Sequence, residues 1–157
     1  MKHVITALVE NQPGVLARIV GLISGRGFNI ESLCVAPTND PTISRITLAV
    51  PGDDRVLEQV TKQLNKLIDV IKVSDLTKEV YVNRELVLFK LNSTRENRTE
   101  IIELAKVYNA SVISIQPKTL VVQFVGAHEK VDEFMELLKP FQIADISRTG
   151  VIAVARD

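Results

Sequence analysis

The chain lacks the residues on which several classes of protein depend. Its 157 residues include one cysteine, two histidines and no tryptophan, and aromatic residues make up only 4%. A single cysteine forms no intramolecular disulfide, which excludes a disulfide-stabilised secreted scaffold, and the cysteine and histidines are too few for a Cys/His zinc site. The scarcity of aromatic rings also leaves little for stacking on single-stranded nucleic acid.

Charge of one sign and long apolar runs are missing too. Lys and Arg total 19, as do Asp and Glu, so the formal net charge is zero. This balance argues against a chain whose main partner is nucleic acid or an anionic membrane. No run of about 18 apolar residues is available to span a bilayer, and the apolar stretch at the N-terminus is too short for a signal peptide. We therefore expect a soluble cytoplasmic protein that binds neither nucleic acid nor membrane.

What is present is the composition of a globular protein, arranged as two similar halves. Hydrophobic residues are 46% and charged residues 24%, and this length suits one ordinary domain or two small ones. In the first half, apolar periodicity predicts the order strand, helix, strand, strand, helix, strand. The predicted segments are Val4–Val9, Val15–Ser24, Asn29–Ala36, Ile43–Val50, a helix capped by Pro51-Gly52-Asp53-Asp54, and Val70–Val73.

The second half repeats this order. Its predicted segments are Glu85–Leu91, Asn97–Tyr108, Ser111–Ile115, Thr119–Val125, His128–Leu138, Ile143–Ser147 and Val151–Ala155. We therefore predict an α+β protein of two ferredoxin-like βαββαβ domains, residues 1–77 and 78–157. Units of about 75 residues have small cores and tend to recruit a neighbour, so we also expect an oligomer.

The turn between the first strand and first helix, Asn11-Gln12-Pro13-Gly14-Val15-Leu16, is the most informative segment. Backbone N–H groups at a helix start lack partners and can hold a carboxylate, and Gly14 lets the ligand approach closely. An asparagine offers both a donor and an acceptor to a zwitterionic amino acid. We expect Asn11 and Asn29 to lie at one end of neighbouring elements. The plainer interpretation is an ordinary Pro-Gly turn with no ligand.

The predicted first helix has an unusual outer face. Small residues and one arginine occupy it, where a solvated face normally carries several Lys and Glu. These residues are Ala17, Arg18, Gly21, Ser24 and Gly25. Either another subunit packs closely there or small residues are simply tolerated.

An enzymatic alternative uses the same segment. Gly14, Arg18 and Asn29 are the residue types with which a small acyl-phosphate hydrolase would bind phosphate and orient water. Against it, Pro13 removes one N–H from the loop, and Arg18 is expected one helical turn away from the strand ends. Elsewhere, Cys34 is expected to be a small buried hydrophobe and His128 to be exposed.

Two longer runs resemble a known family. Asn11-Gln12-Pro13-Gly14-Val15-Leu16-Ala17-Arg18 and Arg26-Gly27-Phe28-Asn29-Ile30-Glu31-Ser32-Leu33 closely resemble the regulatory (small) subunit of acetohydroxyacid synthase, also called acetolactate synthase. Ser44-Arg45 and Gly52-Asp53 continue the match, and Phe28 stands where many members have Tyr. The second half lacks the Pro-Gly turn.

The resemblance implies a first domain of the ACT type and a non-catalytic regulatory subunit. Such a subunit binds a large catalytic subunit, raises its activity, and confers feedback inhibition by a branched-chain amino acid, for which we expect valine. Thiamine diphosphate, Mg²⁺ and FAD would belong to the catalytic partner, and this chain would carry no cofactor. In this family the ligand sits between the N-terminal ACT domains of a homodimer. The matching positions here are Asn11, Gly14, Val15, Leu16, Asn29 and Ile30.

A second functional class stays open at this point. A stand-alone amino-acid sensor that acts through another partner protein would present the same turn. The sequence has no helix-turn-helix and no basic stripe, so direct contact with DNA is not expected.

Overall fold

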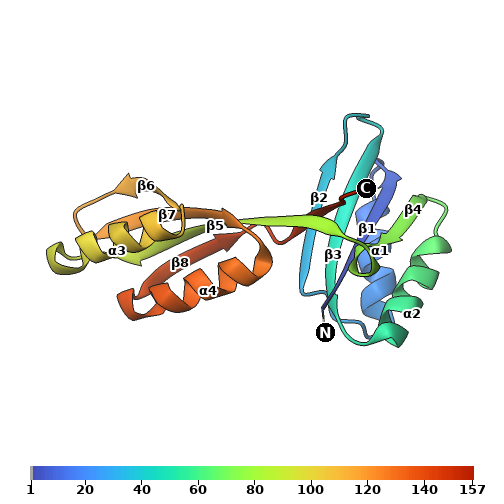
Figure 1. Cartoon of the computed structure of the whole chain (residues 1–157). Coiled ribbons are helices and arrows are strands. Elements are labelled where there is room, and N and C mark those ends of the chain that lie inside the picture. The colour runs from blue at the N-terminus through green and yellow to red at the C-terminus, as the bar shows by residue number, and fades with distance from the viewer. Residues whose placement is uncertain (1) are drawn as a thin grey trace. The chain divides into compact units, whose positions relative to one another are not determined.

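The structure is a computed structural model that describes residues 2–157, and it consists of two compact α+β units (Figure 1). The first unit runs to Val82 and includes Val151–Asp157; the second is Asn83–Gly150. Each contains one antiparallel sheet and two α-helices, which confirms the predicted fold class. The division at residues 77/78 stays a prediction made from the sequence.

In the first unit, two helices cover one face of a four-stranded sheet of order β2-β3-β1-β4. β1 is antiparallel to β3, and β3 is antiparallel to β2, so β1 and β2 run in the same direction. The elements are β1 (Lys2–Glu10), α1 (Val15–Gly25), β2 (Ser32–Pro37), β3 (Ile43–Pro51), α2 (Asp54–Asn65), β4 (Val70–Asp75) and the short 3-10 helix η1 (Leu76–Lys78).

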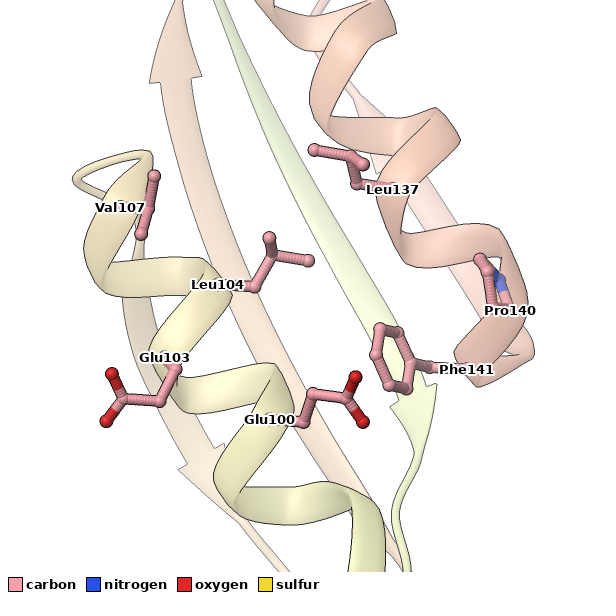
Figure 2. Close-up of a pocket in the computed structure, with 7 residues that line it drawn as sticks. All are labelled: Glu100, Glu103, Leu104, Val107, Leu137, Pro140 and Phe141. Carbon is pink, nitrogen blue, oxygen red and sulfur yellow. The ribbon is translucent and has the colours of Figure 1, made fainter.

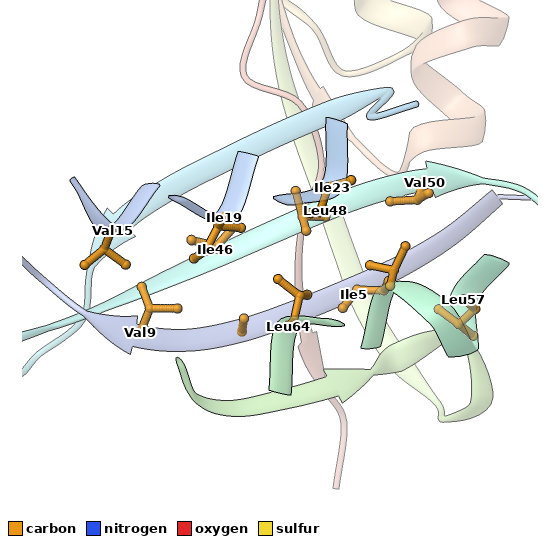
Figure 3. Packing of buried hydrophobic residues seen from close by; sticks show 12 residues of the cluster. Ile5, Val9, Val15, Ile19, Ile23, Ile46, Leu48, Val50, Leu57 and Leu64 are labelled. Carbon is orange, nitrogen blue, oxygen red and sulfur yellow. The ribbon is translucent and has the colours of Figure 1, made fainter. Parts of the chain in front are cut away.

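The core of this unit lies between the sheet and the two helices. Ile19 and Ile23 of α1 meet Ile46 and Leu48 of β3 in Figure 3, and Leu64 of α2 faces β1. All five side chains are at most 1% exposed. At about 25 cal/mol per Å² of apolar surface, each such side chain contributes about 1.5–3 kcal/mol of burial free energy, which fixes α1 on the sheet.

The helix starts of this fold are not alike. α2 begins at Asp53, whose carboxylate accepts from the N–H groups of Arg55 and Val56 at 3.1 Å, as the sequence predicted. In the second unit, α3 begins with a capping box in which Thr94 and Asn97 satisfy each other's backbone N–H groups. α1 begins at Gly14, and no side chain caps it.

The second unit repeats the layout with a sheet of order β6-β7-β5-β8. Its core is more aromatic, with Phe89, Tyr108, Phe124 and Phe134 in edge and tilted ring contacts. The elements are β5 (Tyr81–Asn92), α3 (Arg95–Val107), β6 (Ser111–Ile115), β7 (Thr119–Gly126), α4 (His128–Leu138), the 3-10 helix η2 (Lys139–Phe141) and β8 (Ile143–Arg148).

The last strand differs from its expected place in the second half. β9 (Ile152–Ala155) pairs with β5, and it belongs to the first unit. Ala153 packs with Val4 and Leu76 on the sheet face that the helices leave open, and its carbonyl accepts from Arg45 at 3.0 Å. The physical reason is that Val4 and Leu76 are apolar, and β9 shields both side chains from water.

Candidate functional site

The turn predicted to bind a ligand lies at the C-terminal end of β1. The backbone N–H of Asn11 donates to the Thr42 carbonyl at 2.8 Å, and its side-chain amide donates to the Pro41 carbonyl at 2.9 Å. The turn is therefore held against the β2–β3 connection. Gly14 has φ +85°, a left-handed conformation that residues with a Cβ rarely adopt, so glycine is needed here.

Backbone donors at the start of α1 remain available. The Val15 N–H donates to the Gln12 carbonyl at 3.3 Å, and the first helical bond runs from the Arg18 N–H to the Gly14 carbonyl. Between them lie the N–H groups of Leu16 and Ala17, which the uncapped helix leaves without a side-chain acceptor. The helix dipole adds partial positive charge at this point, so the turn favours a carboxylate or another small anion.

Arg18 lies beside this turn, near the end of β1. The expectation that Arg18 lies away from the strand ends is therefore wrong. A Cβ added at Gly14 would meet a guanidinium nitrogen of Arg18 at 3.2 Å. The guanidinium is held by the Asp69 carboxylate at 2.9 Å, and the Asp69 carbonyl accepts from the N–H of Glu10 at the end of β1. Arg18 thus brings positive charge to the turn, and Asp69 both fixes and partly neutralises it.

Asn29 is at the other end of the unit, so the expectation that it neighbours Asn11 within one chain is wrong. β1 and β2 run in the same direction, and α1 carries the chain back from the end of β1 to the start of β2. Asn29 is exposed just before β2, near Glu31, whose carboxylate pairs with Lys2 at the start of β1. The neighbouring Ile30 is half-buried and packs against the core.

This separation also removes the support for a hydrolase. Within one chain Asn29 cannot orient water at a phosphate held by Gly14 and Arg18, because an 11-residue helix, about 16 Å long, lies between them. The carboxylate of Asp69 already occupies Arg18. Gly14, Arg18 and Asn29 therefore do not form one catalytic site in a single chain.

The small-residue face of α1 is exposed, as the sequence pattern predicted. Ala17, Gly21, Ser24 and Gly25 all face outward, and a Cβ added at Gly21 or Gly25 would meet nothing within 4 Å. The first unit therefore presents a flat strip of small side chains along its first helix.

A second concave region lies in the other unit, between α3 and α4 (Figure 2). Leu104 and Leu137 face one another across it, Phe141 closes one end, and Val107 is 75% exposed at the other. Among residues 2–157, the only charged side chains that line it are the carboxylates of Glu100 and Glu103. Such a groove does not complement the carboxylate of an amino acid.

Sequence reasoning missed a buried charge cluster in the second unit. Glu85 is only 2% exposed, and Arg148 donates two hydrogen bonds to its carboxylate at 2.6 and 3.1 Å. His128 contacts the same carboxylate at 3.3 Å and Asp132 at 3.4 Å, so the histidine is half-buried rather than exposed. Burial by itself would raise the pKa of Glu85, but the Arg148 hydrogen bonds and charge, followed by those of His128, hold the pKa below its usual value.

The described part of the chain offers neither a metal centre nor a helix that spans a membrane. Among residues 2–157, no group of three His, Cys, Asp or Glu side chains is arranged to hold a metal ion. None of the helices in the same range is long and apolar enough to cross a membrane. Cys34 is half-buried on β2.

Comparison with known proteins defines the class of the first unit. Residues 5–72 match the family model described as "AHAS small subunit-like ACT domain", so this unit is an ACT domain. Residues 84–157 match a second family model, "Small subunit of acetolactate synthase".

Relatives that match almost the whole chain identify the family. The chain is 48% identical over 155 residues to a probable acetolactate synthase small subunit of Methanothermobacter thermautotrophicus, covering 98% of this chain and 92% of that protein. It is 44% identical over 157 residues to the acetolactate synthase small subunit of Haemophilus influenzae, covering 99% and 96%. The crystal structure of the Thermotoga maritima small subunit superposes with a TM-score of 0.91 at 35% identity, covering 100% and 98%. The chain belongs to the acetolactate synthase small-subunit family.

Proposed function

We propose that this chain binds the large, thiamine-diphosphate-dependent subunit of acetolactate synthase, activates it, and makes it sensitive to feedback inhibition by a branched-chain amino acid, with valine as the effector. The observation that supports this proposal best is the start of α1 at Gly14, which no side chain caps. The positive φ of Gly14 places free backbone N–H groups on an accessible turn. Thiamine diphosphate, Mg²⁺ and FAD belong to the catalytic partner in this proposal. The chain itself supplies a regulatory site and works in the cytoplasm.

The ligand carboxylate would lie on the backbone from Gly14 to Leu16. The Leu16 N–H and the positive end of the helix dipole favour it, and the guanidinium of Arg18 adds charge from the side. Asn11 stands at the same turn and offers its side-chain carbonyl to the ligand ammonium, because its amide group is already bonded to Pro41. Two or three hydrogen bonds to charged groups, at about 1.5–3 kcal/mol each, contribute about 3–9 kcal/mol in total, a range that includes the about 4.1 kcal/mol of a millimolar dissociation constant.

A second copy of the chain would complete this site. Two protomers related by a two-fold axis can pack their α1 helices antiparallel across the strip formed by Ala17, Gly21, Ser24 and Gly25. That arrangement brings the Gly14 end of one helix beside the Asn29 end of the other. Asn29 then bridges the ligand carboxylate from the partner, and Ile30 borders the pocket for the ligand side chain. The separation of Asn11 and Asn29 within one chain thus favours a homodimeric site.

Gly21→Arg should prevent this dimer. A long cationic side chain at the middle of the small-residue strip would hold the two helices apart and would place like charges face to face. We expect the mass measured by sedimentation equilibrium to fall from dimer to monomer, and valine binding to fall with it. Gln59→Arg, which adds the same side chain to the exposed face of α2, is the control. A Gly21→Arg protein that remains dimeric would show that the strip is merely tolerated.

Asn29→Ala should weaken valine binding about tenfold, since it removes one hydrogen bond to a charged group. Asn29 is exposed and makes no hydrogen bond to other side chains among residues 2–157, so its removal should leave the unfolding temperature unchanged. Titration calorimetry measures the affinity, and Asn65→Ala, an exposed asparagine at the end of α2, is the control. Unchanged affinity in Asn29→Ala would remove Asn29 from the site.

Inhibition requires that valine bind two states of the complex with different affinities. A ligand shifts an equilibrium only by this difference, so the valine-bound dimer must hold the catalytic subunit less favourably or in a less active state. The alternative function is a stand-alone amino-acid sensor, which would bind a protein other than a thiamine-diphosphate enzyme. Co-purification with a thiamine-diphosphate enzyme separates the two.

A further inference from the structure

The open face of the ACT sheet, opposite the helices, contains a polar cavity of about 300 Å³. Its floor consists of residues from three neighbouring strands, and β9 and the segment after η1 form its border. The lining residues are Thr6, Leu8, Arg45, Lys72, Ser74, Leu76, Glu79, Val154, Ala155 and Asp157. All of them belong to the first unit. This volume is at the lower end of small-molecule sites.

Strand register places the polar side chains of this floor in two rows. Leu8 of β1 is directly opposite Arg45 on one side and Lys72 on the other. Thr6, two residues earlier and therefore on the same face, is opposite Thr47 and Ser74. Because neighbouring strands are about 4.8 Å apart, the two cations flank Leu8 at a backbone separation of about 10 Å, which both long side chains can span.

Among residues 2–157, the charged side chains that line the cavity form no ion pairs with each other. Within residues 2–157, neither Arg45 nor Lys72 forms an ion pair, and the two carboxylates that line the cavity, Glu79 and Asp157, form none either. Arg45 donates one hydrogen bond, to the Ala153 carbonyl, and so keeps further guanidinium donors. Arg18 and Arg148, by contrast, are each held by a carboxylate.

We propose that this cavity binds the oxyanion group, carboxylate or phosphate, of a small polar metabolite. Arg45 offers a planar fork that matches such a group, and Lys72 adds a second charge from the far side of Leu8. The hydroxyls of Thr6 and Ser74 donate from the adjacent row. Glu79 and Asp157, at the border, accept hydrogen bonds from a hydroxyl or ammonium elsewhere on the same ligand.

This site is separate from the turn at Gly14. Val15 and Ile19 of α1 pack on the helix-covered face of the sheet, whereas Thr6, Leu8 and Arg45 belong to the opposite face. The two sites can therefore be tested independently, and the failure of either leaves the other unaffected.

The test is a titration of the isotope-labelled full chain with inorganic phosphate and, in parallel, with sodium acetate, at constant pH and ionic strength. We expect saturable changes in the backbone amide resonances of Thr6, Leu8 and Ser74, with millimolar affinity for at least one probe. Lys72→Gln should weaken this binding about tenfold. Lys90→Gln removes the same charge from an exposed strand position in the second unit, and it should have no effect.

Each outcome of these titrations either supports the proposed site or overturns it. Binding of phosphate alone or of acetate alone supports the site and identifies the ligand group, and binding of both supports their shared chemistry. Three results would overturn the proposal: no saturable change with either probe, changes confined to other residues, or equal weakening by Lys72→Gln and Lys90→Gln.

Discussion

Gly14→Asp should abolish valine binding, with an affinity loss of at least about a hundredfold, which is about 2.7 kcal/mol. The new side chain must adopt φ +85° and lies within reach of the Arg18 guanidinium, which a Cβ approaches to 3.2 Å. Its carboxylate would then face the ligand carboxylate and accept from the donors that the ligand needs. The backbone strain and the added negative charge both act where the ligand carboxylate binds. The loss of affinity in Gly14→Asp should therefore exceed the tenfold loss expected for Asn29→Ala.

Gly14→Asn separates charge from shape. Asparagine has the size of aspartate and adopts left-handed backbone conformations more readily than most residues, but it carries no charge. We expect Gly14→Asn to bind valine more weakly than the unaltered chain but clearly more tightly than Gly14→Asp in calorimetry. Equal affinities for the two variants would show that steric exclusion, rather than carboxylate recognition by the turn, explains the loss.

Glu85→Gln should destabilise the second unit by about 1.5–3 kcal/mol, the contribution of a hydrogen bond between charged groups. Arg148 would then face a neutral amide in place of the buried carboxylate of Glu85, which is 2% exposed. Native-state hydrogen exchange of Phe89 and Val122, both fully buried in this unit, measures the change. Glu103→Gln disrupts only a surface pair with Lys106 and should cost less than about 0.5 kcal/mol.

The same cluster predicts how stability depends on pH. Folding lowers the pKa of Glu85, so its ionised form stabilises the folded state at pH values above its unfolded pKa, about 4.3. That contribution is lost as pH falls through the lower, folded pKa. The unaltered protein should therefore lose more stability than Glu85→Gln between about pH 5 and pH 3. Parallel pH profiles for the two proteins would contradict this role of Glu85.

Local sequence patterns were sufficient to predict most of the helices and strands. Alternation and helical spacing placed Ser111–Ile115 and His128–Leu138 at the observed bounds, because one face of each element is buried and the other is solvated. The sequence predicts a cap at Asp53-Asp54, and the Asp53 carboxylate supplies it by accepting from N–H groups two and three residues away. These features depend on neighbours in the chain, which a sequence displays directly.

Features that depend on distant partners were missed. β9 continues the apolar alternation of the second half, so nothing local assigns it to the first unit. Glu85 and Arg148 are 63 residues apart, and no pattern connects them. The same holds for Arg45 and Lys72, which line one cavity only because both strands pair with β1 at Leu8.

The position of Asn29 relative to Asn11 can be predicted from the sequence. A strand, a helix and a second strand parallel to the first form a crossover, in which the turns before and after the helix lie at opposite ends. Applied to β1, α1 and β2, this rule separates Asn11 from Asn29 in one chain, so the proposed site needs a second copy to bring them together. The strip of small residues on α1 is the surface on which we propose that this copy packs.

The central claim is that this chain regulates a catalytic subunit in response to an amino acid. The most direct test is the rate of acetolactate formation by the cognate catalytic subunit, measured with and without this chain, and with valine, leucine and isoleucine in turn. We predict that the chain raises the rate and that valine reverses the increase more effectively than the other two. A rate that is unaffected by saturating amounts of the chain, with or without amino acid, would contradict the proposed function.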